Sequence, residues 1–454
     1  MNSVLTSFIL AGTIFVSSCS ITKKISRSAN EDVLKNKSLL TAHVGISIYE
    51  PATGKTWYDH NGDKYFVPAS NTKLATCYAA MKYLGDSLVS FYVRETPDTI
   101  FIIPAGDPTF LNDEFPQQIF LKKLKSSTKV IDVLYDIRSK VDPFGSGWSW
   151  NDYQEYYMAE RSILPVYGNV ITFEYRKDSL DTRENQNFHA GHLYSTAPVF
   201  NSTYLENPMA ELRQQGPRFR ITRDENQNKF HILASKDSFN SVQIPFRTND
   251  GITAFSFLYT ALNRGYDQLK LSSISNQNNF SPFLSVAKDT LLRIMMHRSD
   301  NFFAEQCVLM VSEKLFGYMD DEKARSYILK NDFTDLPQTP RWADGSGLSR
   351  YNLFSPKDFV AILKKMKDEF GMSRLQTIME TGGTGTIRSY YKADSGYVYG
   401  KTGTLSGVVA FSGFLYTKKG KLLIFSTIVN NHQGNVTEIR HAVEHFLEGI
   451  RNEY

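Results

Sequence analysis

Cysteine is scarce in this sequence. Only Cys19, Cys77 and Cys307 occur among 454 residues, and they form none of the closely spaced cysteine pairs that hold structural zinc. Cys77 and Cys307 could pair in an exported chain. However, each lies on the apolar side of a predicted helix, where a cysteine behaves as a small buried hydrophobe. We therefore expect two buried thiols and no cysteine-based metal site.

An excess of one charge is also absent. The chain has 51 basic and 47 acidic residues and a formal net charge of +4, with no dense basic run or arginine-rich helix. This balance excludes nucleic acid as an expected partner. The apolar content of 41% and charged content of 22% are those of an ordinary globular protein. A chain of this length predicts about two or three domains.

The apolar run near the N-terminus is too short to span a membrane. Residues 8–16 (FILAGTIFV) precede small residues and then Cys19, a pattern typical of a secretory signal. Residues 16–19 (VSSC) also resemble a bacterial lipoprotein cleavage box. We therefore predict a signal peptide over 1–18, lipidation at Cys19, a polar tether over 19–38, and a periplasmic or cell-envelope location. No Lys or Arg precedes the apolar run, which departs from the usual signal pattern.

The two ends of the chain predict one α/β body with helices on both sides of a sheet. Between them, residues 91–246 alternate short strand-like pieces with long polar loops and predict a mainly β insertion. The body then comprises residues 39–90 and 247–454. Its strands are expected over 42–49, 56–58, 397–402, 408–417 and 422–430, and its helices over 70–83, 252–262, 286–296, 302–315, 356–370 and 436–450.

Ser70 and Lys73 stand three residues apart where a loop becomes a helix. This spacing places an amine one turn from a hydroxyl, on the same side of the helix, where it can take the hydroxyl proton. The bare Ser-x-x-Lys pattern is weak, because it recurs at Ser20/Lys23, Ser126/Lys129, Ser285/Lys288 and Ser389/Lys392. Ser70 differs because an apolar-faced helix follows it.

Two further motifs follow Ser70-x-x-Lys73 along the chain. Ser299-Asp300-Asn301 lies in a break between two predicted helices, and Lys401-Thr402-Gly403 ends a β-run, with Thr404 beyond. The order matches the motif set of penicillin-recognising serine enzymes.

Each residue of these elements has an expected role. Ser70 would attack a carbonyl, with Lys73 as base. Ser299 would relay the proton and Asn301 would hold the substrate amide. Gly403 would permit close approach of a peptide. The oxyanion would meet the backbone N–H groups of Ser70 and Thr404. A terminal carboxylate would be received by Lys401, Thr402 and Thr404.

The chain resembles the class C low-molecular-weight penicillin-binding proteins, which are D-alanyl-D-alanine carboxypeptidases and endopeptidases. The resemblance covers roughly residues 40 to 450. Besides the three elements above, it is carried by residues 105–109 (AGDPT), 148–152 (WSWND), 344–350 (DGSGLSR), 385–388 (GTIR) and 401–405 (KTGTL), the last leading into 412–414 (SGF).

The resemblance implies a β-lactamase-like α/β fold with an insertion between the first two elements. It implies peptidoglycan stem peptides as substrates, β-lactams as covalent inhibitors, and no metal or organic cofactor. Asp152 matches an acid linked in the family to recognising the amine of diaminopimelate, although an acid beside an aromatic cluster can also cap a helix. The glycine-rich segments at 344–350 and 382–388 are expected to be turns without a catalytic role.

Three alternatives compete with this interpretation. A serine β-lactamase would share the motifs, but the Glu-x-x-Leu-Asn pattern of class A enzymes is missing; residues 259–263 (YTALN) have tyrosine for glutamate and precede Ser299. A metalloprotease is suggested by His441-x-x-Glu444-His445, but little chain remains for a third zinc ligand. A catalytically silent envelope scaffold would not need the complete motif set.

Overall fold

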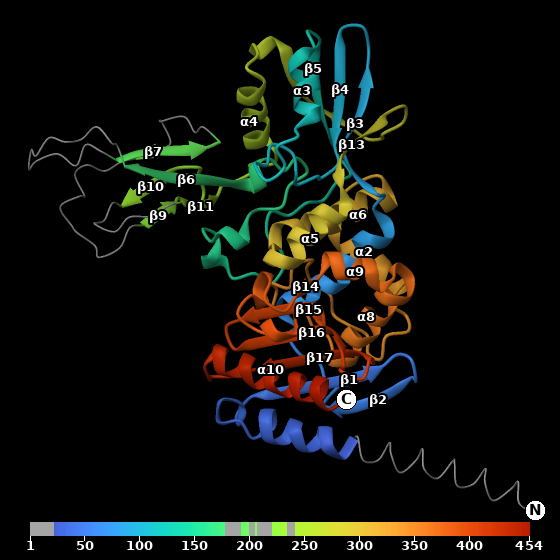
Figure 1. Ribbon diagram of the computed structural model, residues 1–454. Coiled ribbons are helices and arrows are strands. Elements are labelled where there is room, and N and C mark those ends of the chain that lie inside the picture. The colour runs from blue at the N-terminus through green and yellow to red at the C-terminus, as the bar shows by residue number, and fades with distance from the viewer. Residues whose placement is uncertain (1–21, 178–191, 199–204, 207–219, 234–240) are drawn as a thin grey trace, which may run out of the picture. The chain divides into compact units, whose positions relative to one another are not determined.

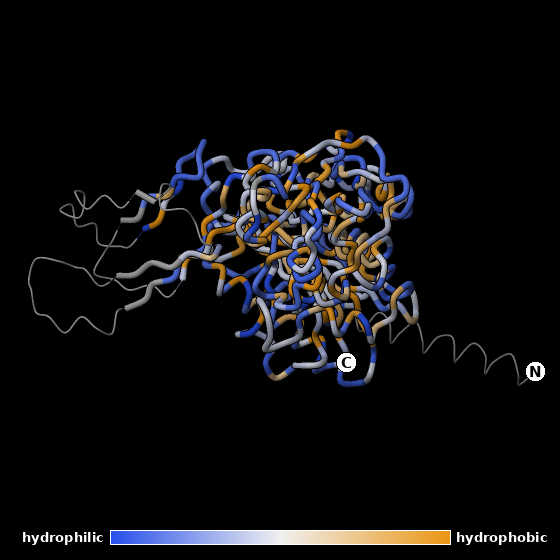
Figure 2. The backbone as a smooth tube through the Cα atoms, turned by 90° about the horizontal axis from the view of Figure 1, so that it is seen from above, coloured by the Kyte–Doolittle hydropathy of each residue, from blue (hydrophilic) through white to orange (hydrophobic). Residues whose placement is uncertain are grey.

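The computed structural model describes residues 22–177, 192–198, 205–206, 220–233 and 241–454 (Figure 1). The chain divides into two compact units. The first contains the chain up to Lys82, Asp289–Asp300 and Arg325–Tyr454, and the second contains Tyr83–Lys288 and Asn301–Ala324. The predicted signal peptide and Cys19 lie outside the described residues. Hydrophobic segments of the backbone gather toward the interior, and hydrophilic ones occupy many of the outer turns (Figure 2).

The first unit is built on a six-stranded sheet to which both ends of the chain contribute, as predicted. The strand order is β14-β15-β16-β17-β1-β2, and β1 joins the C-terminal strands by antiparallel pairing with β17. The strands are β1 (His43–Glu50), β2 (Lys55–His60), β14 (Glu380–Thr381), β15 (Val398–Leu405), β16 (Val408–Tyr416) and β17 (Leu422–Asn430).

Alternating side chains give this sheet two different faces. Phe411 and Phe425 point to one face and pack in a core with Phe446 of α10 (Val436–Glu453). Ser412 and Ser426, one residue further along each strand, point to the other face and are also buried. Helices therefore cover both faces, which confirms the predicted architecture.

The N-terminal part of the described chain is a helix packed on the core. Residues 22–28 are helical and continue into η1 (Ala29–Leu34). Ile25, Ala29 and Val33 are buried in the same core as α10, below which this helix runs in Figure 1. The tether predicted over 19–38 is therefore wrong from residue 22 onward. The polar composition hid an apolar stripe with a four-residue spacing.

The helices of the first unit that the sequence predicted largely follow the predicted limits, whereas those over residues 321–331 and 372–378 were not predicted. α8 (Pro356–Phe370) begins as expected, because the Ser355 hydroxyl accepts the Asp358 N–H and the Asp358 carboxylate accepts the Ser355 N–H. No helix among the described residues is both long and apolar enough to cross a membrane. The other helices are α2 (Lys73–Tyr83), α5 (Lys288–Arg298) and α9 (Met372–Ile378), together with α7 (Asp321–Asn331), whose first turn is counted in the second unit.

The second unit has a five-stranded mixed sheet of order β12-β5-β4-β3-β13 and two three-stranded sheets, β11-β6-β7 and β8-β10-β9. Its core joins Phe91, Phe120 and Ile131 to Phe257 and Leu258 of α4. The elements are β3 (Ser87–Glu95), β4 (Thr99–Pro104), α3 (Ile119–Ser126), β5 (Val130–Asp136), β6 (Val170–Lys177), β7 (His192–Ala197), β8 (Leu205–Glu206), β9 (Arg220–Arg223), β10 (Phe230–Leu233), β11 (Ser241–Pro245), α4 (Ile252–Leu262), β12 (Leu269–Ile274), β13 (Ser281–Ala287) and α6 (Asn301–Phe316).

The limits of the two units differ from those of the predicted domains. Residue 90 lies inside β3, and the segment after residue 246 supplies α4, β12 and β13 to the second unit. The reason is long-range pairing: β12 pairs with β5 in parallel, and β13 pairs with β3. Local sequence patterns do not reveal such pairing. The assignment of residues 91–246 as a separate insertion stays a prediction.

Candidate active site

Ser70 lies in a tight turn ahead of a helix. The turn is a 3₁₀ element, η3 (Ala69–Thr72), and α2 begins directly after it at Lys73. Ala69 adopts a left-handed φ of 48°, an uncommon conformation for a residue with a Cβ. The turn is tied to the sheet, because Asn71 Nδ2 donates to Ser412 Oγ at 2.6 Å and Ser412 Oγ donates to Ser426 Oγ at 2.8 Å. The sheet thereby fixes the position of Ser70.

Lys73 lies beside Ser70, as predicted. Its Nζ is 2.9 Å from Ser70 Oγ and 2.7 Å from the carbonyl oxygen of Ser346. The lysine is 0% exposed. A buried amine within hydrogen-bond distance of a serine hydroxyl is the geometry that a general base requires. This pair is the candidate nucleophile and base of the first unit.

The loop that supplies the Ser346 carbonyl is organised by Asp344. Its buried carboxylate accepts the N–H of Gly347 at 2.8 Å, the N–H of Ser349 at 2.6 Å and Nδ2 of Asn352 at 2.6 Å. Sequence analysis gave residues 344–350 no catalytic role. The structure shows that they position Lys73 through Ser346. The only sequence signal for this role was the mixture of short polar side chains and glycines in residues 344–350, which lies shortly before the start of α8.

Gly347 provides a stability test of this packing. It has φ 83°, and a Cβ added there would lie 1.9 Å from the Ala69 carbonyl oxygen, in the turn that holds Ser70. We expect Gly347→Ala to lower the free energy of unfolding by about 3 kcal/mol and to weaken acylation, since strain and backbone displacement combine.

Gly420→Ala is the matched control. Gly420 has φ 79° but no atom within 4 Å of an added Cβ, so only the backbone conformation is strained, at a cost of about 1 kcal/mol. Denaturant unfolding of both variants measures the difference. Equal losses of stability would show that the contact with Ala69 carries no weight.

Strand β15 brings its residues against the Ser70 turn. A Cβ added to Gly403 would lie 2.6 Å from the carbonyl oxygen of Pro68 and 3.0 Å from the backbone nitrogen of Ser70. Only a glycine allows this approach. Thr404 follows at an exposed position, and its hydroxyl accepts a 2.7 Å hydrogen bond from Arg440 of α10. Gly403 therefore lies against the turn that holds Ser70.

Lys401 is fully buried, and its Nζ donates to the carbonyl oxygen of Thr402 at 2.9 Å. Burial lowers the pKa of Lys401 to about 8; the Glu380 carboxylate opposes this shift and the Arg440 guanidinium adds to it. Lys401 is therefore cationic at neutral pH and loses its charge under mildly alkaline conditions.

Ser299 and Asn301 occupy the break between α5 and α6. Ser299 has a left-handed φ of 60° and belongs to the first unit. Asn301 begins α6 in the second unit, where its Nδ2 donates to the Tyr157 carbonyl oxygen at 3.0 Å. The predicted helix break is present at the predicted place. The catalytic roles of both residues stay predictions.

Asp152 is connected to the start of α6 through Tyr157. Asp152 ends the short element η4 (Trp150–Asp152), and burial together with the Asp152 carboxylate raises the pKa of Tyr157 to about 12. The carbonyl of the same tyrosine accepts the Asn301 hydrogen bond. Within the second unit, Tyr157 therefore links Asp152 to Asn301: its side chain interacts with Asp152 and its carbonyl accepts from Asn301. The sequence did not indicate this link.

The His-x-x-Glu-His segment on α10 makes structural contacts. Glu444 accepts the backbone N–H of Tyr391 and lies 2.7 Å from His441 Nδ1. His445 is exposed and lies 3.6 Å from Asp32. In the part of the chain that the structure describes, no group of three or more His, Cys, Asp or Glu side chains is arranged to hold a metal ion.

The comparisons with known proteins cover nearly the whole chain. The model of the D-Ala-D-Ala carboxypeptidase 3 (S13) family matches residues 27–449. D-alanyl-D-alanine carboxypeptidase DacB of Haemophilus influenzae is 28% identical over 433 residues, covering 87% of each chain. D-alanyl-D-alanine carboxypeptidase of Actinomadura sp. (strain R39) is 24% identical over 447 residues, covering 88% of this chain and 80% of the relative.

A solved structure shares the fold. Penicillin binding protein 4 (dacB) from Haemophilus influenzae has a TM-score of 0.69 and 20% identity, covering 94% of this chain and 98% of the other. The family match confirms the predicted peptidase and disfavours both the β-lactamase and the silent scaffold. This chain belongs to the D-Ala-D-Ala carboxypeptidase (S13) family of serine hydrolases.

Proposed function

We propose that the chain hydrolyses the terminal D-Ala-D-Ala bond of peptidoglycan stem peptides through an acyl-enzyme on Ser70. The single observation that carries this assignment is the 2.9 Å hydrogen bond between Lys73 Nζ and Ser70 Oγ in a buried setting. It provides a nucleophile and its base on one rigid turn. Family membership supports the bond that is cleaved, and the geometry supports the residues that cleave it.

The reaction has two steps. Lys73, in its neutral form, takes the Ser70 proton as Oγ attacks the penultimate D-Ala carbonyl, and the N–H groups of Ser70 and Thr404 stabilise the oxyanion. The C–N bond then breaks, and Ser299 relays a proton to the leaving D-alanine amine. In the second step, water attacks the ester, the Ser70–acyl bond breaks, and the proton returns to Ser70 Oγ.

The substrate would be held at its two ends. Lys401, Thr402 and Thr404 would receive the terminal carboxylate by charge-assisted hydrogen bonds. Asn301 would hold the substrate amide, and Asp152 would accept the side-chain amine of diaminopimelate. Recognition of this amine would also allow the enzyme to cleave D-Ala-diaminopimelate cross-links.

The proposed substrate lies in the bacterial envelope, so we propose an exported enzyme. The support is the N-terminal apolar run followed by the cleavage box at Cys19. Lipidation of Cys19 would hold the enzyme at the membrane surface. Mass analysis of the chain isolated from membranes tests this: a diacylglycerol adduct at Cys19 is expected, and an unmodified chain starting at another residue would contradict it.

Digestion of purified peptidoglycan tests the reaction. Released D-alanine marks carboxypeptidase action, and conversion of cross-linked dimers to monomers marks endopeptidase action; mass spectrometry of the fragments separates the two. We expect both products from the wild type and neither from Ser70→Ala. Digestion by the Ser70→Ala protein would contradict the proposal.

The pKa of Lys401 predicts a pH dependence of substrate binding. Because that pKa is lowered to about 8, the amine is positive below this pH and neutral above it. We therefore expect KM for a D-Ala-D-Ala peptide to rise by about tenfold between pH 7 and pH 9.5, as one charge-assisted contact to the terminal carboxylate is lost. Steady-state kinetics across this range measure the effect. A flat KM would show that Lys401 does not receive the carboxylate.

A further inference from the structure

Arg440 is a cation beside the proposed carboxylate-binding strand that the mechanism above does not use. It lies in the second turn of α10 and is half-buried. Its Nη2 donates to the Thr404 hydroxyl at 2.7 Å. This hydrogen bond joins α10 directly to a hydroxyl that is proposed to receive the terminal carboxylate of the substrate.

The direction of this hydrogen bond decides what the Thr404 hydroxyl can still do. A guanidinium can only donate, whereas a threonine hydroxyl has one proton and two acceptor positions. Arg440 occupies one acceptor position, and among the described residues no acceptor is found for the hydroxyl proton. Thr404 is also exposed, on an edge of β15 that β14 covers only at Tyr399 and Gly400. The hydroxyl can therefore donate to an incoming carboxylate while it accepts from Arg440.

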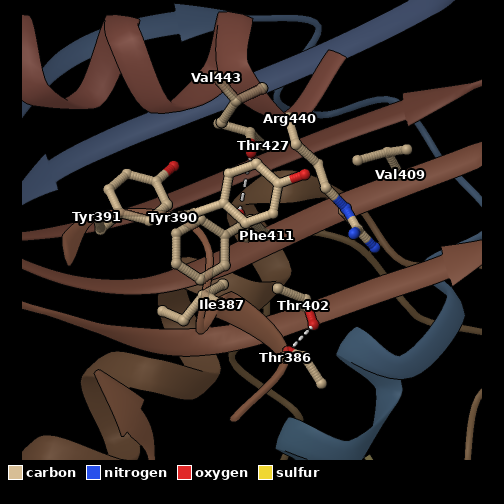
Figure 3. A pocket seen from close by; sticks show the side chains of 11 residues that line it. Thr386, Ile387, Tyr390, Tyr391, Thr402, Val409, Phe411, Thr427, Arg440 and Val443 are labelled. Carbon is tan, nitrogen blue, oxygen red and sulfur yellow. Dashed lines mark hydrogen bonds between the residues drawn. The ribbon is translucent and has the colours of Figure 1, made fainter. Parts of the chain in front are cut away.

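The hydroxyl of the neighbouring Thr402 lacks this freedom. It is hydrogen-bonded to the Thr386 hydroxyl, which donates its own proton to the Glu380 carboxylate. The Thr402 proton is therefore used in the bond to Thr386. Figure 3 shows these two threonines joined beside an apolar cavity under α10, with Arg440 extending from α10 along the same cavity. The hydroxyl contact proposed above is thereby narrowed to Thr404.

The guanidinium of Arg440 keeps an uncompensated charge. In the part of the chain that the structure describes, no Asp or Glu oxygen lies within 4.0 Å of it. Arg451 of the same helix differs, because it is buried and pairs with Asp394 at 2.7 Å. A hydroxyl that accepts a hydrogen bond from a cation becomes a stronger donor, since consecutive hydrogen bonds polarise one another. Arg440 therefore strengthens the Thr404 hydroxyl as a donor to an anion.

Tyr390 holds the same guanidinium by a second contact. The Arg440 Cζ lies 5.7 Å from the centroid of the Tyr390 ring, within the range of a cation–π interaction. Tyr390 is itself buried, and its ring centroid is 5.0 Å from that of His441, the next residue of α10. The guanidinium is thus fixed between an aromatic ring and the Thr404 hydroxyl.

We propose that Arg440 is a positioning residue that holds the Thr404 hydroxyl oriented and polarised to donate to the terminal carboxylate of the substrate. The proposal rests on the function assigned to Thr404 above and requires no contact between Arg440 and the substrate. It gives α10 a role in specificity besides its packing in the core. Loss of the guanidinium should weaken the binding of carboxylate-bearing peptides and leave the chemistry at Ser70 intact.

Arg440→Gln tests this role at pH 7, where Lys401 is cationic in both proteins. Burial lowers the pKa of Lys401 to about 8 and the Arg440 guanidinium adds to that shift, so the variant only favours the lysine charge. KM for a D-Ala-D-Ala peptide should rise about tenfold with kcat little changed. Arg440→Lys, which keeps the charge, should restore part of the binding. A folded Arg440→Gln protein with the wild-type KM would overturn the proposal.

An amidated peptide shows whether the effect depends on the carboxylate. The same peptide with a C-terminal amide, used as a competitor, should bind the wild type and Arg440→Gln equally. Equal weakening of the acid and the amide would contradict the proposal, because a general change of the site would then explain both.

Thr404→Val shows whether the effect passes through the hydroxyl. Valine removes the hydroxyl and keeps the backbone N–H that is proposed for the oxyanion. In the Thr404→Val background, Arg440→Gln should change KM by less than about twofold, since the two residues act as one unit. A tenfold rise in both backgrounds would show that Arg440 acts independently of Thr404 and would contradict the proposal.

Arg27→Gln is the matched control for charge. Arg27 is an exposed arginine of the same unit and pairs with Glu31 at 2.9 Å. Its replacement changes the net charge equally and should leave KM unchanged; an equal rise would assign the effect to net charge and contradict the proposal. Hydrolysis and penicillin labelling of Ser70 in the wild type test the proposed function separately. If both occur and Arg440→Gln has no effect, only the role of Arg440 is rejected.

Discussion

Ser70→Ala is expected to lose all but a trace of hydrolysis, on the order of 10⁵-fold or more in kcat. The substitution removes only Oγ, so the turn, its tie from Asn71 to Ser412 and the β15 contact should remain. Stability should therefore change little. Binding of the peptide should also survive, because the groups proposed to hold it are untouched. The assay is release of D-alanine from a D-Ala-D-Ala peptide.

The chain offers a control for this variant in another Ser-x-x-Lys pair. Ser389 precedes Lys392 with the same spacing, but it is exposed on a loop. Ser389→Ala should keep full activity. If Ser389→Ala lost activity as severely as Ser70→Ala, or if Ser70→Ala stayed active, the nucleophile assignment would be wrong.

Lys73→Met is expected to lower the acylation rate by about 10³- to 10⁴-fold, the typical contribution of a general base. Methionine keeps most of the buried volume but cannot accept the Ser70 proton. It also leaves the Ser346 carbonyl without its 2.7 Å donor, so some loss of stability should accompany the loss of rate. Stopped-flow acylation by a chromogenic cephalosporin measures the rate.

Lys82→Met is the matched control on the same helix. Lys82 lies near the other end of α2 and pairs with Asp332 at 2.7 Å. Its replacement removes an amine of α2 and an ion pair but no proposed catalytic group, so acylation should stay within about twofold of the wild type. Equal losses in the two variants would assign the effect to the helix and not to the base.

The parts of the fold carried by local signals could be predicted. The capping box at Ser355 and Gly371 set the ends of α8, and the apolar β-runs gave β16 and β17 nearly to the residue. The sheet from both ends of the chain followed from the order of these elements. Ser70 and Lys73 could be selected because three motifs had to occur in one order.

Features that depend on distant partners could not be predicted. The apolar stripe of Ile25, Ala29 and Val33 is recognisable as a buried face only once α10 packs on it. Strands β12 and β13 join the second unit only by pairing with strands far away in the sequence. The Asp344 loop likewise positions Lys73 from a remote segment.

Mapping the acylated residue tests the central claim most directly. The full-length protein is incubated with penicillin and digested, and the adduct is located by tandem mass spectrometry. We predict one penicilloyl group per chain, attached to Ser70, and none in Ser70→Ala. An adduct on another serine, or a folded wild-type protein that takes up no penicillin, would contradict the account.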